Sequence, residues 1–417
     1  MKNCILKNII LYILILICAF AFHPTAYGQT TILTASCSLN MQQYIDYIIS
    51  STIAENNECT WTPSTRIFET IPLFDLEDNH NGYIFNLNNG EQECGYIQIA
   101  IIDNAFYLVC YCFEGHNAIK DELEQKQKIN FKLAEENPKI IYTGSMNYVI
   151  KQENQFFDLV SKENVTSTYS DFYNQYNTFK TNMKSYEISS RDIVKKLSVH
   201  ATPATSAAPV KRYVTNADAA ILVAQNSFYN RTLNGVSIGS LIAENGGICA
   251  PTTGTNLIKY WALKRGVTAL DCPYSSFSRE DKDWWICSSL MVRMNMDMTT
   301  GGVTPSNFYN GLKTYSTSTR GVQWSGADFV SSSLSLTFNK AKSIIDSNVP
   351  FGLGVPGHRS SCFGYHITSD GSKQLIINTT GLTKATNSNG TYRYIPAWEF
   401  HSFSSLDIQS YIYVRWN

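Results

Sequence analysis

The segment over residues 246–261, GGICAPTTGTNLIKYW, places one cysteine, Cys249, where an amphipathic helix is expected to begin. Two preceding glycines allow a tight turn, and Pro251 is tolerated only in the first turn of a helix. Apolar residues then recur at helical spacing, so the helix can pack on a core and leave the thiol at the positive end of its dipole. That position favours a thiolate. The segment predicts a nucleophilic cysteine, with a structural cysteine or a disulfide as the alternative.

The N-terminus has the form of an export signal. Lys2 and Lys7 precede an apolar run over 9–22, and the small-residue stretch 26–28 fits a signal peptidase site. The run has about 14 residues, fewer than the roughly 20 that span a bilayer. We therefore expect a cleaved signal peptide, no stable membrane span, and a secreted or cell-surface protein. Lipidation of Cys18 is the less favoured alternative, because the residue before it is not small.

The composition argues against binding to nucleic acid or to an anionic membrane, and it indicates at least one cysteine without a partner in the chain. The net charge of -1 provides no basic footprint for nucleic acid or for an anionic membrane. Of 11 cysteines, Cys4 and Cys18 fall in the signal, so an odd number remains and at least one thiol is unpaired or joined to another chain. Cys272, Cys287 and Cys362 could supply one disulfide. Neither a CxxC pair nor a His/Cys cluster at zinc spacing occurs, and we expect no metal or organic cofactor.

Two domains are expected after the signal peptide at 1–28, because the remaining chain is long for one domain and is 44% hydrophobic over its full length. We expect an N-terminal α+β domain at 29–188, a linker at 189–212 and a second domain at 213–417. The first domain reads as a helix followed by a meander of strands and further helices, at 41–54, 83–87, 95–102, 105–112, 121–133 and 156–184. The linker is rich in small residues, with two prolines and two basic pairs. It suits a passive tether and an activation segment equally.

The second domain reads as α+β, with a helical half before an antiparallel sheet half. The expected helices are 216–226, the Cys249 helix, 283–296 and 306–315. The expected strands are 351–355, 363–368, 375–378, 392–395 and 408–414.

A cysteine nucleophile needs a base, and usually a third group that orients it. His358, His366 and His401 lie in the second domain. We favour His366, because a strand fixes a side chain better than the loop expected at His358. Simple hairpin pairing puts Asn378 opposite Phe363, so a partnership between Asn378 and either histidine requires a bulge or a twist.

An oxyanion site needs N–H donors beside the nucleophile. The backbone N–H of Cys249 is one candidate, and the side-chain amide of Asn245 is the second. Asn245 also suits a turn beside two glycines, and this reading stays open.

The segment CAPTTGTNLIKYW resembles the nucleophile helix of papain-like bacterial cysteine peptidases, especially the branch related to bacteriocin-leader peptidases and, more distantly, streptopain. NVPFGLGV, GYHITSDG and LIIN resemble that family's later strands in the same order. The resemblance implies a papain-like fold with Cys249 as nucleophile, His366 as general base and acid, Asn378 as orienter and Asn245 as an oxyanion donor. The first domain resembles a streptopain-type propeptide through YIFNL and GYIQIA. The family's glutamine shortly before the cysteine and its tryptophan after the orienter are missing.

These observations lead us to expect a secreted cysteine endopeptidase, made as a zymogen, that acts on polypeptides and is restrained by its own N-terminal domain. The alternative is a secreted binding or adhesion module that keeps the fold without catalysis. Hydrolysis and acyl transfer to an amine are not distinguished by the sequence.

Overall fold

The computed structural model describes residues 40–121, 138–152, 155–159, 165–193, 208–244, 247–331, 336–381, 383–387 and 392–416. The expected signal peptide lies outside these residues, as do Asn245 and residues 122–133 of the helix expected at 121–133. Asp121 itself is described and is helical. Within the described residues, no helix is both long and apolar enough to cross a bilayer.

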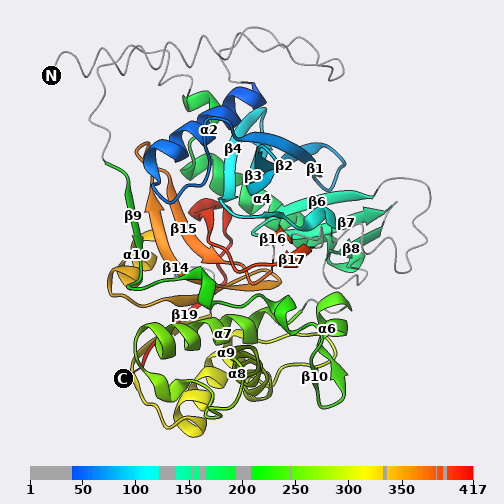
Figure 1. Cartoon of the computed structure of the whole chain (residues 1–417). Helices are drawn as coiled ribbons and strands as arrows, with labels where there is room; N and C mark the ends of the chain where they lie inside the picture. Colours follow the sequence, from blue (N-terminus) through cyan, green and yellow to red (C-terminus); the bar gives the residue numbers. More distant parts are fainter. Residues whose placement is uncertain are drawn as a thin grey trace, which may run out of the picture. The chain divides into compact units, whose positions relative to one another are not determined.

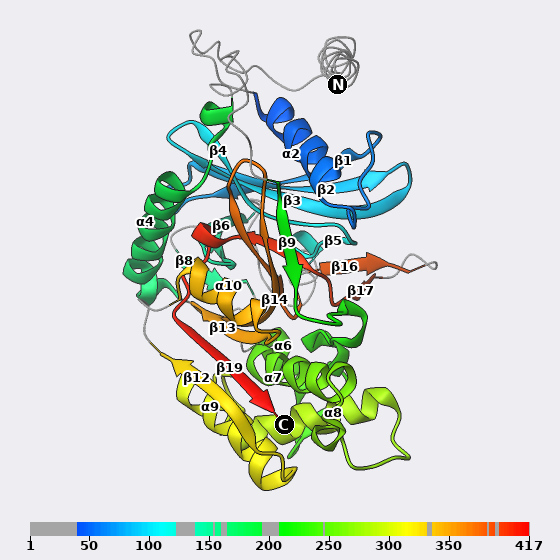
Figure 2. The same ribbon diagram turned by 90° about the vertical axis from the view of Figure 1, so that its left-hand side faces the viewer.

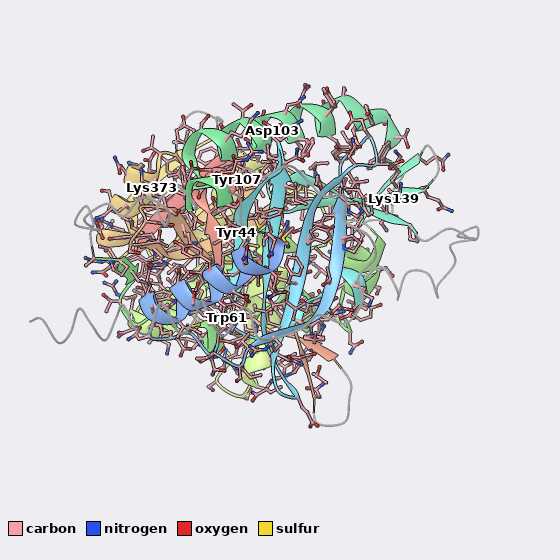
Figure 3. All side chains as sticks on the ribbon, turned by 90° about the horizontal axis from the view of Figure 1, so that it is seen from above. Tyr44, Trp61, Asp103, Tyr107, Lys139 and Lys373 are labelled. Carbon is pink, nitrogen blue, oxygen red and sulfur yellow. The ribbon has the colours of Figure 1, made fainter. Side chains whose placement is uncertain are left out.

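The N-terminal part begins with a helix packed on an antiparallel meander. Helix α2 (Met41–Glu55) starts with a capping box, in which Asn40 and Gln43 each bond the other's backbone N–H. Strands β1 (Arg66–Phe74), β2 (His80–Asn89), β3 (Gln92–Ile102) and β4 (Ala105–Cys112) follow in sheet order. Figure 3 shows α2 lying across these strands, with Tyr44 labelled on the helix. The expected helix and three expected strands are confirmed here.

The next elements complete the N-terminal part of the sheet. They are β5 (His116–Asn117), β6 (Lys139–Gly144), β7 (Asn147–Gln152), β8 (Gln155–Asp158) and α4 (Tyr169–Tyr186). The helix expected over 156–184 is therefore wrong at its start, because Phe156 is buried in β8 and the chain becomes helical only after it. A 3-10 turn at Thr166–Thr168 leads into α4.

The C-terminal part has its helices first and most of its strands later, as expected. The helices are α6 (Ile238–Glu244), α7 (Cys249–Lys259), α8 (Arg279–Arg293), α9 (Pro305–Thr314) and α10 (Phe338–Asp346). The strands are β9 (Val210–Tyr213), β10 (Thr232–Leu233), β11 (Val236–Ser237), β12 (Trp324–Val330), β13 (Phe351–Val355), β14 (His358–Ile367), β15 (Lys373–Asn378), β16 (Thr383–Thr386), β17 (Tyr392–Tyr394), β18 (Glu399–Ser402) and β19 (Ser410–Trp416). Shorter helical pieces are Ala219–Ile221, Gln225–Phe228, Tyr260–Lys264, Thr268–Leu270, Tyr315–Thr319 and Phe403–Ser405.

One large sheet joins both expected domains. Its order is β12-β19-β13-β14-β15-β18-β4-β3-β2-β1-β6-β7-β8, with β9 on β14. The junction is the antiparallel pair of β18 with β4, where Phe400 lies opposite Tyr111. Figure 1 shows α7, α8 and α9 (green to yellow) gathered on the far side of β14 and β15 from α2. The α+β class is confirmed.

Part of the expected linker is a strand. Residues 210–212 belong to β9, which pairs with β14 over Gly364–Ile367, whereas β13 pairs with the first half of β14. Figure 2 shows β9 running beside β14. The backbone of β14 beyond the end of β13 would otherwise have unpaired N–H and C=O groups, so β9 completes that edge.

Candidate active site

Cys249 begins α7 and is a partly exposed residue, while the rest of the helix is buried. Gly247 permits this entry, because it has φ of +86° and a Cβ there would lie 2.4 Å from Oε1 of Gln225. Pro251 lies in the first turn, where its missing N–H costs nothing. The N-terminal position of the cysteine, expected from the sequence, is confirmed.

His358 is the histidine that faces Cys249. Burial acts to raise the pKa of the thiol, but the charge and hydrogen bond of His358, together with the Arg359 backbone N–H and side-chain charge, hold that pKa below the ordinary cysteine value. Burial acts to lower the pKa of His358, but Cys249 and the Thr379 carbonyl raise it above the ordinary histidine value. The two groups therefore favour a thiolate–imidazolium pair.

The imidazole is held in one orientation. Its Nε2 lies 2.7 Å from the backbone oxygen of Thr379. Because a carbonyl oxygen only accepts, Nε2 carries hydrogen and donates, which leaves Nδ1 as the nitrogen available to the sulfur. A backbone carbonyl thus takes the orienting role that the sequence assigned to a side chain.

His366 does not face Cys249, and the expectation that it is the base is corrected. In β14 an extra residue, Phe363, lies between Cys362, which pairs with Ile377, and Gly364, which pairs with Ile376. Side chains alternate along a strand, and one extra residue reverses the alternation. His358 and His366 therefore lie on opposite faces of the sheet, although they are eight positions apart and regular alternation would place them on the same face.

His366 is instead buried at 1% exposure on the side of the sheet covered by α2. Its Nδ1 lies 3.1 Å from Oε1 of Gln374, and its Nε2 has no partner among the described residues. A cavity of about 60 Å³ adjoins it, lined also by Tyr44 and Ile48. Burial lowers the pKa of His366, so the ring is held neutral in a place that the thiol does not reach.

Asn378 lies near the site but does not contact the imidazole. Its Oδ1 accepts from Nδ2 of Asn256 at 3.2 Å, and its own Nδ2 donates to the Ala397 carbonyl at 3.4 Å. Asn378 therefore ties β15 to α7, and the expected orienting role is corrected: the next residue, Thr379, holds His358. Asn378 lies opposite Ser361 rather than Phe363, because the turn pairs Ile367 with Lys373 and the bulge in β14 then shifts the register by one more residue.

A buried acid supports Thr379. Glu399, on β18, accepts from the Thr379 hydroxyl at 2.6 Å and from the Thr383 hydroxyl at 3.0 Å. Its second oxygen lies 2.9 Å from Nε2 of His401. Glu399 is 1% exposed, so each of these bonds lies out of water. Through Glu399, this network connects strand β18, which pairs with β4 of the N-terminal part, to Thr379, which orients His358.

A glutamine that sequence reasoning missed lies beside the nucleophile. Gln225 is buried, and its Oε1 accepts from the Ile248 backbone N–H at 3.0 Å. Its Nε2 donates to no described residue, so it is a candidate oxyanion donor together with the Cys249 N–H. Gln225 reaches the site from a separate turn, Gln225–Phe228, so the residues that surround Cys249 in the sequence give no sign of it. The expected donor, Asn245, lies outside the described residues.

The described cysteines and acids add two findings. The eight described cysteines are all free, so the disulfide considered for Cys272, Cys287 and Cys362 does not form among them. No group of three or more His, Cys, Asp or Glu side chains in the described part of the chain is arranged to hold a metal ion.

No protein-family model matches the chain, and no curated protein sequence is similar to it.

Proposed function

We propose that the protein is a secreted cysteine peptidase that hydrolyses peptide bonds through Cys249 and His358. The pairing of the Cys249 thiol, at a helix N-terminus, with an imidazole that the Thr379 carbonyl fixes carries this proposal. The combination matches the requirements for covalent catalysis: an activated nucleophile, a base in reach and a group that orients the base.

The reaction follows from these positions. The Cys249 thiolate attacks the carbonyl carbon of the scissile peptide bond, and the carbonyl oxygen becomes negative. The C–N bond then breaks, and the leaving amine takes a proton from the His358 imidazolium, which leaves a thioester. His358 next removes a proton from water as the water attacks the thioester. The carboxylic acid product departs, and the sulfur and imidazole return to their starting state.

The oxyanion donors give a prediction of their own. Replacing Gln225 with alanine is expected to lower kcat by about 10²–10³-fold and to leave KM nearly unchanged, because the amide acts on charge that develops only in the transition state. Steady-state kinetics on a fluorogenic peptide measure this. Gln225→Glu keeps an acceptor for the Ile248 N–H but removes the amide donor, so it is expected to be no better than alanine. Gln92→Ala, at an exposed position on β3, is the control. An unchanged kcat in both Gln225 variants would remove the amide from the mechanism.

The proposed function is tested by the reactivity of Cys249. Because the pKa of Cys249 is lowered, its alkylation by iodoacetamide is expected to rise and reach its plateau below the pH at which an ordinary cysteine ionises. Peptidase activity also needs the imidazolium, so it is expected to fall as pH rises through the raised pKa of His358. In His358→Ala the thiolate loses the charge and the hydrogen bond of His358, so the alkylation profile is expected to move to higher pH.

The measurement follows the alkylation rate by mass spectrometry from pH 5 to 10, with cleavage of a labelled unfolded protein as the second readout. Cys249→Ala is the control for both. A thiol that reacts like a free cysteine, together with no cleavage, would instead favour the non-catalytic binding module.

The N-terminal part is proposed to restrain this activity. Its strand β4 pairs with β18, which carries Glu399, and its helix α2 covers the β14–β15 hairpin that carries His358. The test is incubation of the purified chain under reducing conditions. Cleavage within 189–212 that depends on Cys249 and accompanies a gain in activity supports a zymogen, and activity that does not change after such cleavage contradicts it.

A further inference from the structure

Arg359 follows the candidate catalytic histidine and is 6% exposed. Its guanidinium donates through Nη2 to Oγ of Ser410 at 3.2 Å and lies over the Phe308 ring, with Cζ 4.4 Å from the ring centroid. Its own carbonyl accepts from the Thr253 hydroxyl at 3.0 Å, which fixes the strand against α7. The side chain is therefore held between β19, α9 and the strand it belongs to.

The surrounding backbone makes room for the guanidinium. A Cβ on Gly354 would lie 2.5 Å from Oγ of Ser410 and 3.0 Å from Nη2 of Arg359. A Cβ on Gly352 would lie 3.2 Å from the Phe308 ring. Glycine at both positions keeps open the space that the arginine and its aromatic neighbour occupy.

The buried cation has no carboxylate partner among the residues that the structure describes. No described acidic side chain forms an ion pair with Arg359, and the charge that acts on it is that of the Cys249 thiolate. Nε and Nη1 of Arg359 donate to no described residue. Neither atom is one of the polar atoms that protein encloses fully and leaves without a partner, so neither is sealed from solvent. Buried guanidinium groups are normally matched by an anion, often by a carboxylate that takes two parallel N–H bonds.

We propose that Arg359 is a subsite for a carboxylate of the peptide substrate, next to the reacting sulfur. This proposal rests on the proposed peptidase function and adds a substrate class to it. Nε and Nη1 supply the donors, and the ring of Phe308 and the hydroxyl of Ser410 hold them in place. The carboxylate belongs either to an acidic side chain near the scissile bond or to the C-terminus of a short peptide, and both present the same chemistry.

The subsite is tested with two small alkylating reagents that differ in charge. Iodoacetate carries a carboxylate and iodoacetamide does not, and both alkylate the thiolate of Cys249. A change in thiolate fraction alters both rates equally, so their ratio isolates attraction of the carboxylate. In Arg359→Gln the ratio of the iodoacetate rate to the iodoacetamide rate is expected to fall about tenfold. Arg359→Lys keeps the positive charge but loses the planar guanidinium with its paired N–H donors, and the ratio is expected to fall about threefold.

Controls separate this result from misfolding and from failure of the function. Arg415→Gln removes an exposed arginine from β19 and is expected to leave the ratio unchanged. If Arg359→Gln does not fold, Arg359→Lys supplies the comparison, because both variants leave the His358 imidazolium in place and change only the guanidinium. An unchanged ratio in the folded variant overturns the subsite. A Cys249 that reacts with neither reagent faster than a free cysteine contradicts the peptidase proposal instead.

Peptide pairs identify the source of the carboxylate. One pair exchanges Glu for Gln beside the scissile bond, and the other exchanges a free C-terminus for an amide. The pair whose kcat/KM preference for the acid disappears in Arg359→Gln identifies the group. Equal kcat/KM within both pairs for the unaltered protein contradicts the subsite.

Discussion

Replacing His358 with alanine is expected to lower kcat/KM for peptide hydrolysis by about 10³-fold or more, whereas replacing His366 with glutamine is expected to change it by less than about threefold. In the proposed mechanism His358 both stabilises the thiolate and donates the proton to the leaving amine, so both functions would be lost together. His366 lies on the opposite face of the sheet, beside Gln374, and glutamine can keep a hydrogen bond in its place.

The measurement is steady-state hydrolysis of a fluorogenic peptide, with circular dichroism and Tm as tests of folding. His80→Ala, at an exposed position at the start of β2, is a matched control for loss of a histidine. Retained activity in His358→Ala together with loss in a folded His366→Gln would reverse the assignment and restore the histidine favoured by the sequence.

Replacing Glu399 with alanine is expected to lower the free energy of unfolding by about 3–5 kcal/mol. The carboxylate accepts from Thr379 and Thr383 and pairs with His401, and all of these groups are buried. Its removal leaves their hydrogen-bonding groups unsatisfied out of water. Thr379 also loses the bond that fixes it, so the folded fraction is expected to have a lower kcat as His358 loses its orientation.

Urea unfolding at neutral pH measures the stability, and activity per folded molecule measures the effect on the site. Glu91→Ala, in the exposed turn between β2 and β3, is the control and is expected to change stability by less than about 0.5 kcal/mol. Glu399→Gln keeps one acceptor oxygen, so its loss in the free energy of unfolding is expected to lie between those of Glu399→Ala and the control. An unfolding midpoint for Glu399→Ala equal to that of the control would show that the network contributes nothing.

Local patterns were enough to predict many of the elements. The period of apolar residues, Gly247 and Pro251 predicted that α7 begins at Cys249, because these constraints act within a few residues. Strand β4 has its predicted range and β3 ends where predicted but begins at Gln92 rather than at 95, since alternation and turn residues are also local signals. β9 was missed, because its residues form a strand only where β14 offers an unpaired edge.

The amino-acid sequence by itself determined the start of α7 at Cys249 and the α+β class, because both follow from short-range periodicity and from residues with fixed backbone preferences. Only the tertiary structure decided which histidine reaches the thiol. The single extra residue Phe363 reverses the faces of β14, and a bulge of this kind forms through pairing with β15, not through the preferences of β14 alone. Folding likewise determined the places of Thr379 and Gln225 at the site. The backbone carbonyl of Thr379 and the side chain of Gln225, which comes from a separate turn, contribute only through the positions that packing gives them.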